Sequence, residues 1–219
     1  MSDDVRAARW GGLAPLPSMS GAITFLREFL AAPRSVGAVW PSSPALAEAM
    51  LQPVDFAHTR ALVEFGPGTG AFTRAILPRL APGARYLGIE LNHAFCVALA
   101  EAFPGIDVVE ASVTRLETLL AERDIAQVDA IISGLPWASL PVSLQEEVFP
   151  MIARVLAPGG VFVTFAYLHG LWLPGARALR ARLRATFGEV ARSPVVWSNV
   201  PPALCLICRR TEETPPSAA

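Results

Sequence analysis

From residue 60 to residue 209 the sequence alternates short apolar runs with longer amphipathic stretches. The apolar runs predict strands at 61–65, 85–90, 106–110, 127–133, 159–166, 191–197 and 202–209. The stretches between them predict helices at 70–80, 93–102, 113–122, 143–156 and 176–187. Strands that alternate with helices predict an α/β fold with a seven-stranded, mainly parallel sheet and helices on both faces. Since no helix separates the last two strands, we expect them to form an antiparallel pair at one edge.

The two ends of the chain differ from this middle part. Residues 1–19 mix charge, glycine and proline without periodicity and are expected to form a mobile leader. Residues 20–56 predict an N-terminal helical segment with helices at 20–32 and 44–51. Residues 57–210 contain the alternating pattern and predict one α/β domain, followed by a disordered tail at 211–219.

Composition narrows the class of protein. Apolar residues make up 53% of the chain and charged residues 17%, which excludes a disordered chain. The net charge of -1 excludes a uniformly basic protein that coats nucleic acid. Three sparse cysteines and the lack of a signal peptide predict a cytoplasmic protein. The mean hydropathy of +0.42 indicates an apolar partner or a membrane surface, although no run reaches the roughly 20 apolar residues of a spanning helix.

A glycine-rich loop follows the first strand of the alternating part. The strand 61–65 leads directly into Gly66-Pro67-Gly68-Thr69-Gly70, where a helix is predicted to start. Glycines permit a tight turn and the close approach of a ligand to the backbone, and a helix N-terminus offers free N–H groups. The pattern G-x-G-x-x-G/A of dinucleotide-binding proteins also matches this loop, so the glycines alone do not distinguish between cofactors.

Two carboxylates near this loop distinguish between the possible cofactors. Glu90 ends the second strand, where a carboxylate accepts the two ribose hydroxyls of any nucleoside. Glu64 lies two residues before the first glycine, and a carboxylate there repels a pyrophosphate but attracts the ammonium group of an amino acid. Glu64 to Gly70 therefore resembles the loop with which class I methyltransferases bind S-adenosylmethionine, a nucleoside joined to an amino acid. A nucleotide-dependent dehydrogenase and a purely structural turn are the alternatives.

A second loop, Ser133-Gly134-Leu135-Pro136-Trp137, follows the fourth strand. Ligands of open α/β sheets bind beyond the carboxyl ends of the strands, so this loop is expected to border the transferred methyl group. The flat face of Trp137 is suited to a methylated amine, because an aromatic face attracts an ammonium group. An ordinary strand-to-helix turn is the alternative.

This second loop resembles two related groups of methyltransferases. Nucleic-acid adenine methyltransferases, such as the ribosomal RNA adenine dimethyltransferases, carry Asn-(Leu/Pro)-Pro-aromatic here, and their polar residue holds the amine of a flipped-out base. Gly134 occupies that position in this chain. Ser133 to Pro136 instead resembles the bacterial phospholipid N-methyltransferases, as do residues 33–43, 165–167 and 199–203. This resemblance implies a Rossmann-like class I methyltransferase domain at 57–210.

The same resemblance implies a set of cofactor-binding residues. It assigns S-adenosylmethionine to Glu64, Gly66, Pro67, Gly68, Thr69, Gly70, Glu90, Leu91, Ser112, Val113, Ser133 and Gly134. Three departures from the family lie near this pocket: Ala111-Ser112-Val113 in place of Gly-Asp-Ala, the bulky Trp137, and Phe165-Ala166-Tyr167-Leu168 in place of Phe-Thr-Tyr-Gly. Ser112 lacks the charge of the aspartate, so we expect a lower cofactor affinity. These departures leave the identity of the methyl acceptor open.

The reaction that the resemblance implies is methyl transfer to an amine, with the headgroup of phosphatidylethanolamine as the first candidate. The protein's part in such an in-line displacement is to align and desolvate the acceptor. Tyr167 is the candidate for orienting the amine, and His169 is the candidate proton acceptor because of its reference pKa of about 6.5. With Trp137 they make up the predicted catalytic set; for His169, an exposed loop histidine is the alternative.

A phospholipid acceptor also implies peripheral contact with the inner face of the membrane. Helix 20–32 has a wide apolar face that suits either packing on the domain or lying on lipid. Helix 176–187 carries arginines at 177, 180 and 184 beside apolar residues at 179, 183 and 187. That arrangement suits either anionic lipid or a solvated face over the core.

Three other functions stay open: a small-molecule N- or O-methyltransferase of specialised metabolism, an RNA adenine N-methyltransferase, and a non-catalytic cofactor-binding module. Nucleic acid is not an expected partner, because Gly134 and the overall charge argue against it. No metal is expected either. Cys205 and Cys208 lie three positions apart on a predicted strand and should face opposite sides, and His58 and His93 give no ligand pattern.

Overall fold

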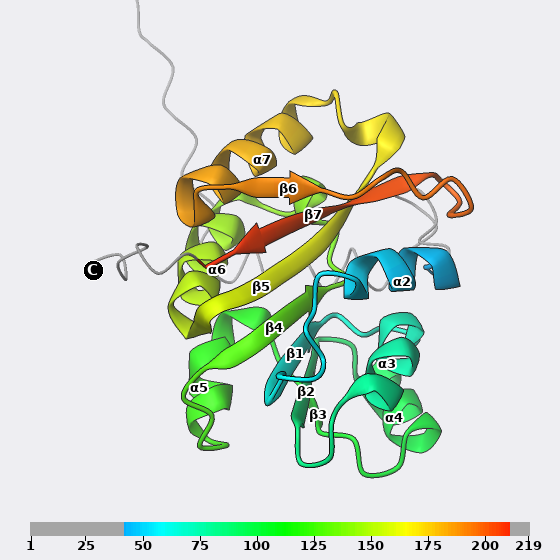
Figure 1. Cartoon of the computed structure of the whole chain (residues 1–219), viewed down its shortest axis with the longest axis vertical. Helices are drawn as coiled ribbons and strands as arrows, with labels where there is room; N and C mark the ends of the chain where they lie inside the picture. The colour runs from blue at the N-terminus through cyan, green and yellow to red at the C-terminus, as the bar shows by residue number, and fades with distance from the viewer. Residues whose placement is uncertain (1–41, 211–219) are drawn as a thin grey trace, which may run out of the picture.

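The computed structural model of the protein describes residues 42–210 (Figure 1). The predicted leader at 1–19, the predicted helix at 20–32 and the predicted tail at 211–219 lie outside the described residues. Within the described part, α2 (Pro44–Leu51) confirms the helix predicted at 44–51. None of the helices in residues 42–210 has the length and the apolar character that crossing a membrane requires.

The described residues form a seven-stranded sheet in the order β3-β2-β1-β4-β5-β7-β6. Its strands are β1 (Ala61–Phe65), β2 (Arg85–Glu90), β3 (Val108–Glu110), β4 (Val128–Ser133), β5 (Leu156–Tyr167), β6 (Val190–Arg192) and β7 (Ala203–Arg209). β1 to β5 run parallel, whereas β7 runs antiparallel to both β5 and β6. The predicted α/β fold and its antiparallel edge pair are confirmed, and β7 lies inside the sheet between β5 and β6.

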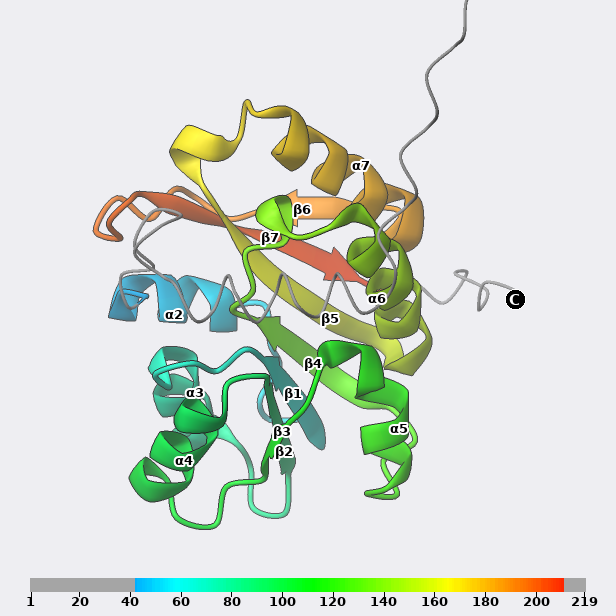
Figure 2. The same cartoon turned by 180° about the vertical axis from the view of Figure 1, so that it is seen from behind.

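Helices cover both faces of this sheet, as the two opposite views show (Figures 1 and 2). One face carries α2 and α3 (Ala71–Ile76), with α4 (His93–Ala102) beside α3, and the other carries α5 (Leu116–Ala121), α6 (Val142–Val155) and α7 (Pro174–Phe187). Short 3-10 turns adjoin them: η1 (Leu77–Arg79), η2 (Val113–Arg115), η3 (Trp137–Ser139) and η4 (Leu168–Gly170). The predicted helix 70–80 is thus divided into α3 and η1, because Pro78 lacks the N–H group that would continue the α-helix.

The hydrophobic core is divided by the sheet into two clusters of buried side chains. One cluster lies against α5, α6 and α7, and the other lies against α2 and α3. Because the strands are buried on both faces, their sequences are almost continuously apolar. Cys208 belongs to the first cluster and Cys205 to the second, which confirms the prediction that they face opposite sides.

The apolar face of α7 belongs to this core. Leu179, Leu183 and Phe187 are all buried in the first cluster, where Phe187 stacks on Phe162 of β5 with 5.9 Å between the ring centroids. These side chains are therefore not available for insertion into lipid. The apolar side of this helix is thus part of the core, whereas Arg177 and Arg184 are exposed.

α2 is integrated into the same domain. Leu46 and Met50 are fully buried in one cluster with Leu62 of β1. Ser43 caps the helix, because its hydroxyl accepts a hydrogen bond from the N–H of Leu46 at 3.2 Å. The core consequently continues across residue 57, where the sequence predicted a boundary between a helical segment and the domain.

The strand predicted at 191–197 is much shorter in the structure. β6 ends at Arg192, and beyond it an isolated bridge joins Val196 to Ala203. Two residues explain the break. The Ser193 hydroxyl accepts a hydrogen bond from the N–H of Cys205 at 2.9 Å, in place of a backbone carbonyl. Pro194 has no N–H group that could donate to a neighbouring strand. Residues 193–202 therefore form a long connection between β6 and β7.

Candidate active site

The loops predicted to bind a ligand gather at one edge of the sheet. β1, β2, β4 and β5 are parallel neighbours, so their carboxyl ends meet there. β1 is followed by residues 66–70, β2 ends at Glu90, β4 leads into Gly134, and β5 ends at Tyr167. In open α/β sheets this edge is where ligands bind.

The loop after β1 has a backbone that requires its glycines. Gly66, Gly68 and Gly70 have φ angles of +62°, +56° and +80°, a region that side chains disfavour. Gly66 also has no room for a side chain, because a Cβ atom there would lie 2.6 Å from the side chain of Leu135. The loop therefore lies closely against the loop that follows β4.

Glu64 is fully buried just before this loop. Its Oε2 accepts hydrogen bonds from the hydroxyl of Tyr86 at 2.6 Å and from the hydroxyl of Thr73 at 2.8 Å. Its Oε1 has no hydrogen-bond partner among the described residues. Burial raises the pKa of this carboxyl to about 7, although the two hydroxyls partly oppose that shift. A buried carboxylate oxygen without a partner is costly, and a ligand that brings an N–H donor would satisfy it.

Glu90 holds the glycine loop in place. One oxygen of its buried carboxylate accepts the N–H of Gly68 at 3.0 Å, and the other accepts the N–H of Asn92 at 2.9 Å. Burial raises the pKa of this carboxyl above its usual range. A carboxylate has about four acceptor positions, so two remain for a ligand. Cys96, on α4, donates a weak hydrogen bond to the backbone carbonyl of Glu90 at 3.7 Å.

Ser133 and Trp137 are joined inside the loop after β4. The Ser133 hydroxyl accepts hydrogen bonds from the indole N–H of Trp137 at 2.8 Å and from the backbone N–H of Leu135 at 3.3 Å. The Trp137 ring is fully buried and meets Phe149 of α6 edge to face, with 4.9 Å between ring centroids. Gln145 of α6 closes the loop by donating to the carbonyl oxygens of Trp137 and Leu140 at 2.8 Å and 3.0 Å.

Tyr167 and His169 lie together at the end of β5. Their rings stack with 5.8 Å between the centroids and an interplanar angle of 16°. Tyr167 is half-buried, and burial raises the pKa of its hydroxyl, whereas His169 is exposed. Phe165 supports the Tyr167 ring from the side at 5.4 Å. Both residues predicted to act on the acceptor are thus in contact with one another at the edge of the sheet where the cofactor loops end.

Comparisons with known proteins agree with this geometry. Residues 63–162 match a family model described as "Methyltransferase domain". The ornithine lipid N-methyltransferase of Singulisphaera acidiphila is 32% identical over 195 residues, which are 87% of this chain and 96% of that protein. The chain belongs to the class I S-adenosylmethionine-dependent methyltransferases.

Solved structures show that the methyltransferase fold extends over almost the whole domain. The O-methyltransferase TomG from Streptomyces achromogenes, determined in complex with S-adenosylmethionine, superimposes with a TM-score of 0.61 and 18% identity, over 87% of this chain and 89% of that one. An O-methyltransferase from Bacillus cereus in complex with S-adenosylhomocysteine gives a TM-score of 0.57 and 12% identity, over 88% and 92%. S-adenosylmethionine is the cofactor of this methyltransferase.

The residues at the edge of the sheet fit this cofactor. The unpartnered Oε1 of Glu64 is suited to its ammonium group, and the free acceptor positions of Glu90 are suited to its ribose hydroxyls. The Ser112 hydroxyl is already engaged, because it accepts from the backbone N–H and the hydroxyl of Thr114 at 3.3 Å and 2.9 Å. Val113 belongs to the first core cluster, and the partly buried Leu91 packs against that cluster. We propose that both line the adenine side of the site.

The structure corrects the role predicted for Trp137. A fully buried ring that donates its only N–H group to Ser133 has no face open to a substrate ammonium. It therefore fixes the shape of the β4 loop from inside the core. The sequence motif did not indicate this, because a tryptophan after a ligand-binding strand is compatible with either side of the loop.

Gly134 has a steric reason to be glycine. A Cβ atom at this position would lie 2.8 Å from the carbonyl oxygen of Gly66, which is closer than real Cβ contacts. We expect Gly134→Ala to separate the two loops, to destabilise the fold by about 1–3 kcal/mol, and to weaken cofactor binding. Thermal unfolding and calorimetric titration with S-adenosylmethionine measure both effects.

Gly170→Ala is the matched control for this prediction. A Cβ atom at Gly170 would have nothing within 4 Å, and its φ angle is not positive. We expect this variant to unfold and to bind the cofactor as the unmodified protein does. Equal behaviour of the two variants would contradict the steric argument.

Sequence reasoning missed the hydrogen-bond partners of Glu64. Tyr86 reaches Glu64 from β2, because Gly88, the residue paired with Glu64, has no side chain that would crowd the Tyr86 hydroxyl. A tyrosine two residues before a glycine on the neighbouring strand was the available signal. Neither His58 nor His93 belongs to the site: the first pairs with Asp55 and the second with Glu110, both at the surface.

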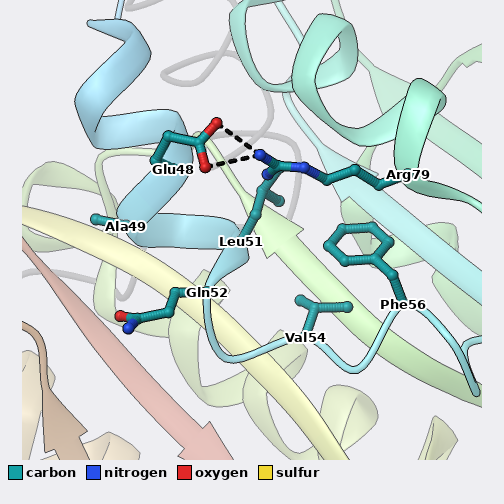
Figure 3. A pocket seen from close by; sticks show the side chains of 7 residues that line it. All are labelled: Glu48, Ala49, Leu51, Gln52, Val54, Phe56 and Arg79. Atoms are coloured by element: carbon teal, nitrogen blue, oxygen red, sulfur yellow. Dashed lines mark hydrogen bonds and ion pairs between the residues drawn. The ribbon is translucent and has the colours of Figure 1, made fainter.

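The hollow shown in Figure 3 lies away from these loops. It has a volume of about 480 Å³ and lies beside α2, the segment before β1 and η1; its lining residues are Glu48, Ala49, Leu51, Gln52, Val54, Phe56 and Arg79. Arg79 pairs with Glu48 at 2.6 Å and places its guanidinium 6.0 Å from the centroid of the Phe56 ring. These contacts join α2 to η1, and we assign them a structural role. Residues 42–210 contain no group of three metal-ligating side chains.

Proposed function

We propose that this methyltransferase transfers methyl groups to the amine of a membrane lipid headgroup. The observation that carries the proposal is the 32% identity to an ornithine lipid N-methyltransferase over nearly its full length. Phosphatidylethanolamine is the acceptor indicated by the motifs at 133–136 and 199–203, and an ornithine lipid is the acceptor indicated by that relative. The two share one chemistry, a primary amine on an aliphatic carbon at the membrane surface.

The bound cofactor would supply an electrophilic methyl group. The amine lone pair forms the N–C bond as the C–S bond breaks, and the electron pair of that bond stays on sulfur. The methylated amine then loses a proton to water or a base. The protein's part is to hold the neutral amine in line. We assign that orientation to Tyr167, whose half-buried hydroxyl and ring lie at the edge of the sheet. His169, stacked on Tyr167 and exposed, is suited to pass the proton to solvent.

The geometry of the β4 loop argues against an adenine base as the acceptor. Adenine methyltransferases need a polar side chain at the position of Gly134 to hold the exocyclic amine. Here the carbonyl oxygen of Gly66 occupies the space that such a side chain would need. The carbonyl of Ser133 is also engaged, because it accepts a hydrogen bond from Thr164 at 3.4 Å.

Label transfer from cofactor to lipid tests the proposed function. The full chain is incubated with methyl-labelled S-adenosylmethionine and phosphatidylcholine vesicles that contain phosphatidylethanolamine, an ornithine lipid, or neither. We expect label in the organic extract with one of the two amine lipids and none with phosphatidylcholine alone. Cofactor binding without label in either lipid would overturn the proposal and would favour a small water-soluble acceptor.

Substitutions of Tyr167 test its orienting role. We expect Tyr167→Phe to lower kcat/KM about fivefold to tenfold, because one hydrogen bond contributes about 1 kcal/mol. Tyr167→Ala also removes the aromatic face, which attracts a developing ammonium by about 0.5–2 kcal/mol, so we expect a loss of roughly 30-fold or more. Tyr167→Phe keeps a ring that stacks on His169, so the difference between the two variants measures the aromatic face. A Tyr167→Ala enzyme with unchanged kcat/KM would remove this residue from the mechanism.

A further inference from the structure

We propose that two turns beside the active site form a surface that enters the membrane interface and presents the lipid headgroup to the catalytic edge. The inference rests on the proposed lipid acceptor and adds to it the place of contact. The surface is made of the turn after β5 and the connection before β7. We call it the interfacial surface; its apolar members are Trp172, Leu173, Trp197 and Val200.

The exposure of these side chains is unusual for large apolar groups. Trp172 is 84% exposed, Trp197 70%, Val200 68% and Leu173 58%. Among the described residues the other large apolar side chains with comparable exposure are Val97 and Val142, at 44% and 45%. Exposed apolar side chains that gather in one place mark a site of contact with a partner or a membrane.

The two turns are joined to one another at the end of β5. Tyr167 pairs with Ala203 of β7, and the N–H of Leu168 donates to the carbonyl oxygen of Pro202 at 2.8 Å. Both turns project beyond the end of β5, on the side of α2 in each view (Figures 1 and 2). This is the carboxyl edge of the parallel strands, where the cofactor loops and Tyr167 lie. The interfacial surface therefore lies at the same edge of the sheet as Tyr167, the residue to which we assign the acceptor amine.

A cluster of positive charge lies next to the apolar residues. Arg180 of α7 donates to the carbonyl oxygen of Leu171 at 3.0 Å, which attaches the helix to the turn that carries Trp172. Arg177 and Arg184 lie three and four positions from Arg180 on α7 and so share its side of the helix. Burial and the charges of Arg192, Arg184 and Arg177 lower the pKa of Arg180. None of the four takes part in an ion pair with another residue of the described part.

This combination suits a lipid interface better than a protein partner. Tryptophan rings prefer the headgroup region of a bilayer, where the apolar ring is buried and the N–H group stays hydrated. Arginines beside them attract anionic lipid, each with about 1 kcal/mol near the surface. The apolar face of α7 is in the core, so that helix contributes its charges from the flank while the two turns enter the interface.

Sedimentation with vesicles tests the surface. The full chain is mixed with phosphatidylcholine vesicles with or without phosphatidylglycerol, neither of which is an acceptor. We expect Trp172→Ala combined with Trp197→Ala to lower the partition coefficient about tenfold or more, because membrane binding scales with the apolar area buried. Val97→Ala, an exposed apolar side chain on α4, is the control and should bind as the unmodified protein does. Partition of the double alanine variant equal to that of the control would overturn the proposal.

Two further measurements sharpen the result. Arg177→Gln combined with Arg184→Gln should lower binding to anionic vesicles about tenfold and leave binding to neutral vesicles unchanged. Brominated phosphatidylcholine should quench the tryptophan emission of the unmodified protein more than that of Trp172→Phe combined with Trp197→Phe. Absence of vesicle binding, with self-association that the double alanine variant abolishes, would assign the surface to a second copy and overturn the membrane assignment.

Methyl transfer to a short-chain amine lipid, dispersed in water without vesicles, separates this inference from the proposed function. If the interfacial surface only docks the enzyme, the double alanine variant should methylate the dispersed lipid at the unmodified rate and the vesicle lipid at least about tenfold more slowly. An equal loss with both forms would contradict docking. If the unmodified enzyme labels neither form of lipid, the proposed function fails, while the sedimentation result still decides the docking surface.

Discussion

Replacement of Glu64 by glutamine is expected to raise the dissociation constant of S-adenosylmethionine about 30-fold or more. The carboxylate is buried and its Oε1 lacks a partner among the described residues, so the cofactor's ammonium group is the charge that would balance it. Removal of one member of such a buried pair costs roughly 2–5 kcal/mol. Glutamine keeps the shape and an acceptor for Tyr86 and Thr73, so we expect the fold to persist.

The pH dependence of S-adenosylmethionine binding tests whether the charge of Glu64 is responsible for this effect. The pKa of Glu64 without cofactor is about 7, so the ionised form that attracts an ammonium increases as pH rises towards 7. Affinity should increase from pH 5.5 to about 7.5 and fall above about 8, where an α-amino group loses its proton. Glu64→Gln should remove the rise and keep the fall. Calorimetric titrations across this range measure both limbs, and a flat profile for the unmodified protein would contradict the assignment.

The same carboxyl links stability to pH with a defined sign. Its pKa is raised from 4.5 in the unfolded chain to about 7 in the fold, so the folded protein holds a proton that the unfolded chain has released. This contribution to stability is fully present below pH 4.5 and is lost as the pH rises through 7. The thermal midpoint of Glu64→Gln should therefore depend less on pH between 5 and 7 than that of the unmodified protein.

Trp137→Ala is expected to cause the largest loss of stability. The ring is fully buried against Phe149, and removal of a buried tryptophan costs about 3–5 kcal/mol. In a domain of this size each kcal/mol shifts Tm by about 2–4 °C, so we expect a fall of roughly 6–20 °C. Calorimetry or circular dichroism measures it. Trp172→Ala is the matched control, because that ring is 84% exposed and its removal should leave Tm almost unchanged.

Trp137→Phe separates a structural role from a catalytic one. Phenylalanine fills most of the cavity and loses the hydrogen bond to Ser133, so we expect a smaller fall in Tm. Once folded, the variant should keep kcat/KM within about threefold of the unmodified enzyme. A normally folded variant that no longer methylates lipid would show instead that the indole contacts the acceptor.

The parts of the fold that were predictable are those with a strong local pattern. Residues 61–65 are apolar apart from one acid and are followed by glycines, and the structure makes them β1 and its loop. The missing helix between the last two strands correctly indicated antiparallel pairing. The length of β6 was not predictable from apolar content, because the single hydroxyl of Ser193 diverts the ladder and Pro194 cannot continue it.

The candidate site was predictable as a set of positions and less so as a set of roles. The motif placed Trp137 next to the site. The burial of its ring, however, depends on Phe149 and Gln145, which belong to α6 further along the chain. Likewise, Glu90 was interpreted as a ribose ligand, whereas its hydrogen bond to Gly68 also gives it a part in shaping the loop. Contacts between distant segments set such roles, and no short motif contains them.

The position of β7 has a consequence for how the chain is made. Residues 203–209 form the strand next to the edge of the sheet, between two strands that the ribosome produces earlier. Until they emerge, β5 presents an unpaired edge, and neither cluster has its Cys205 or Cys208 side chain. Exposed strand edges of this kind promote aggregation. The nascent protein therefore completes its sheet only after residues 203–209 have left the ribosome, and until then a chaperone has most to protect.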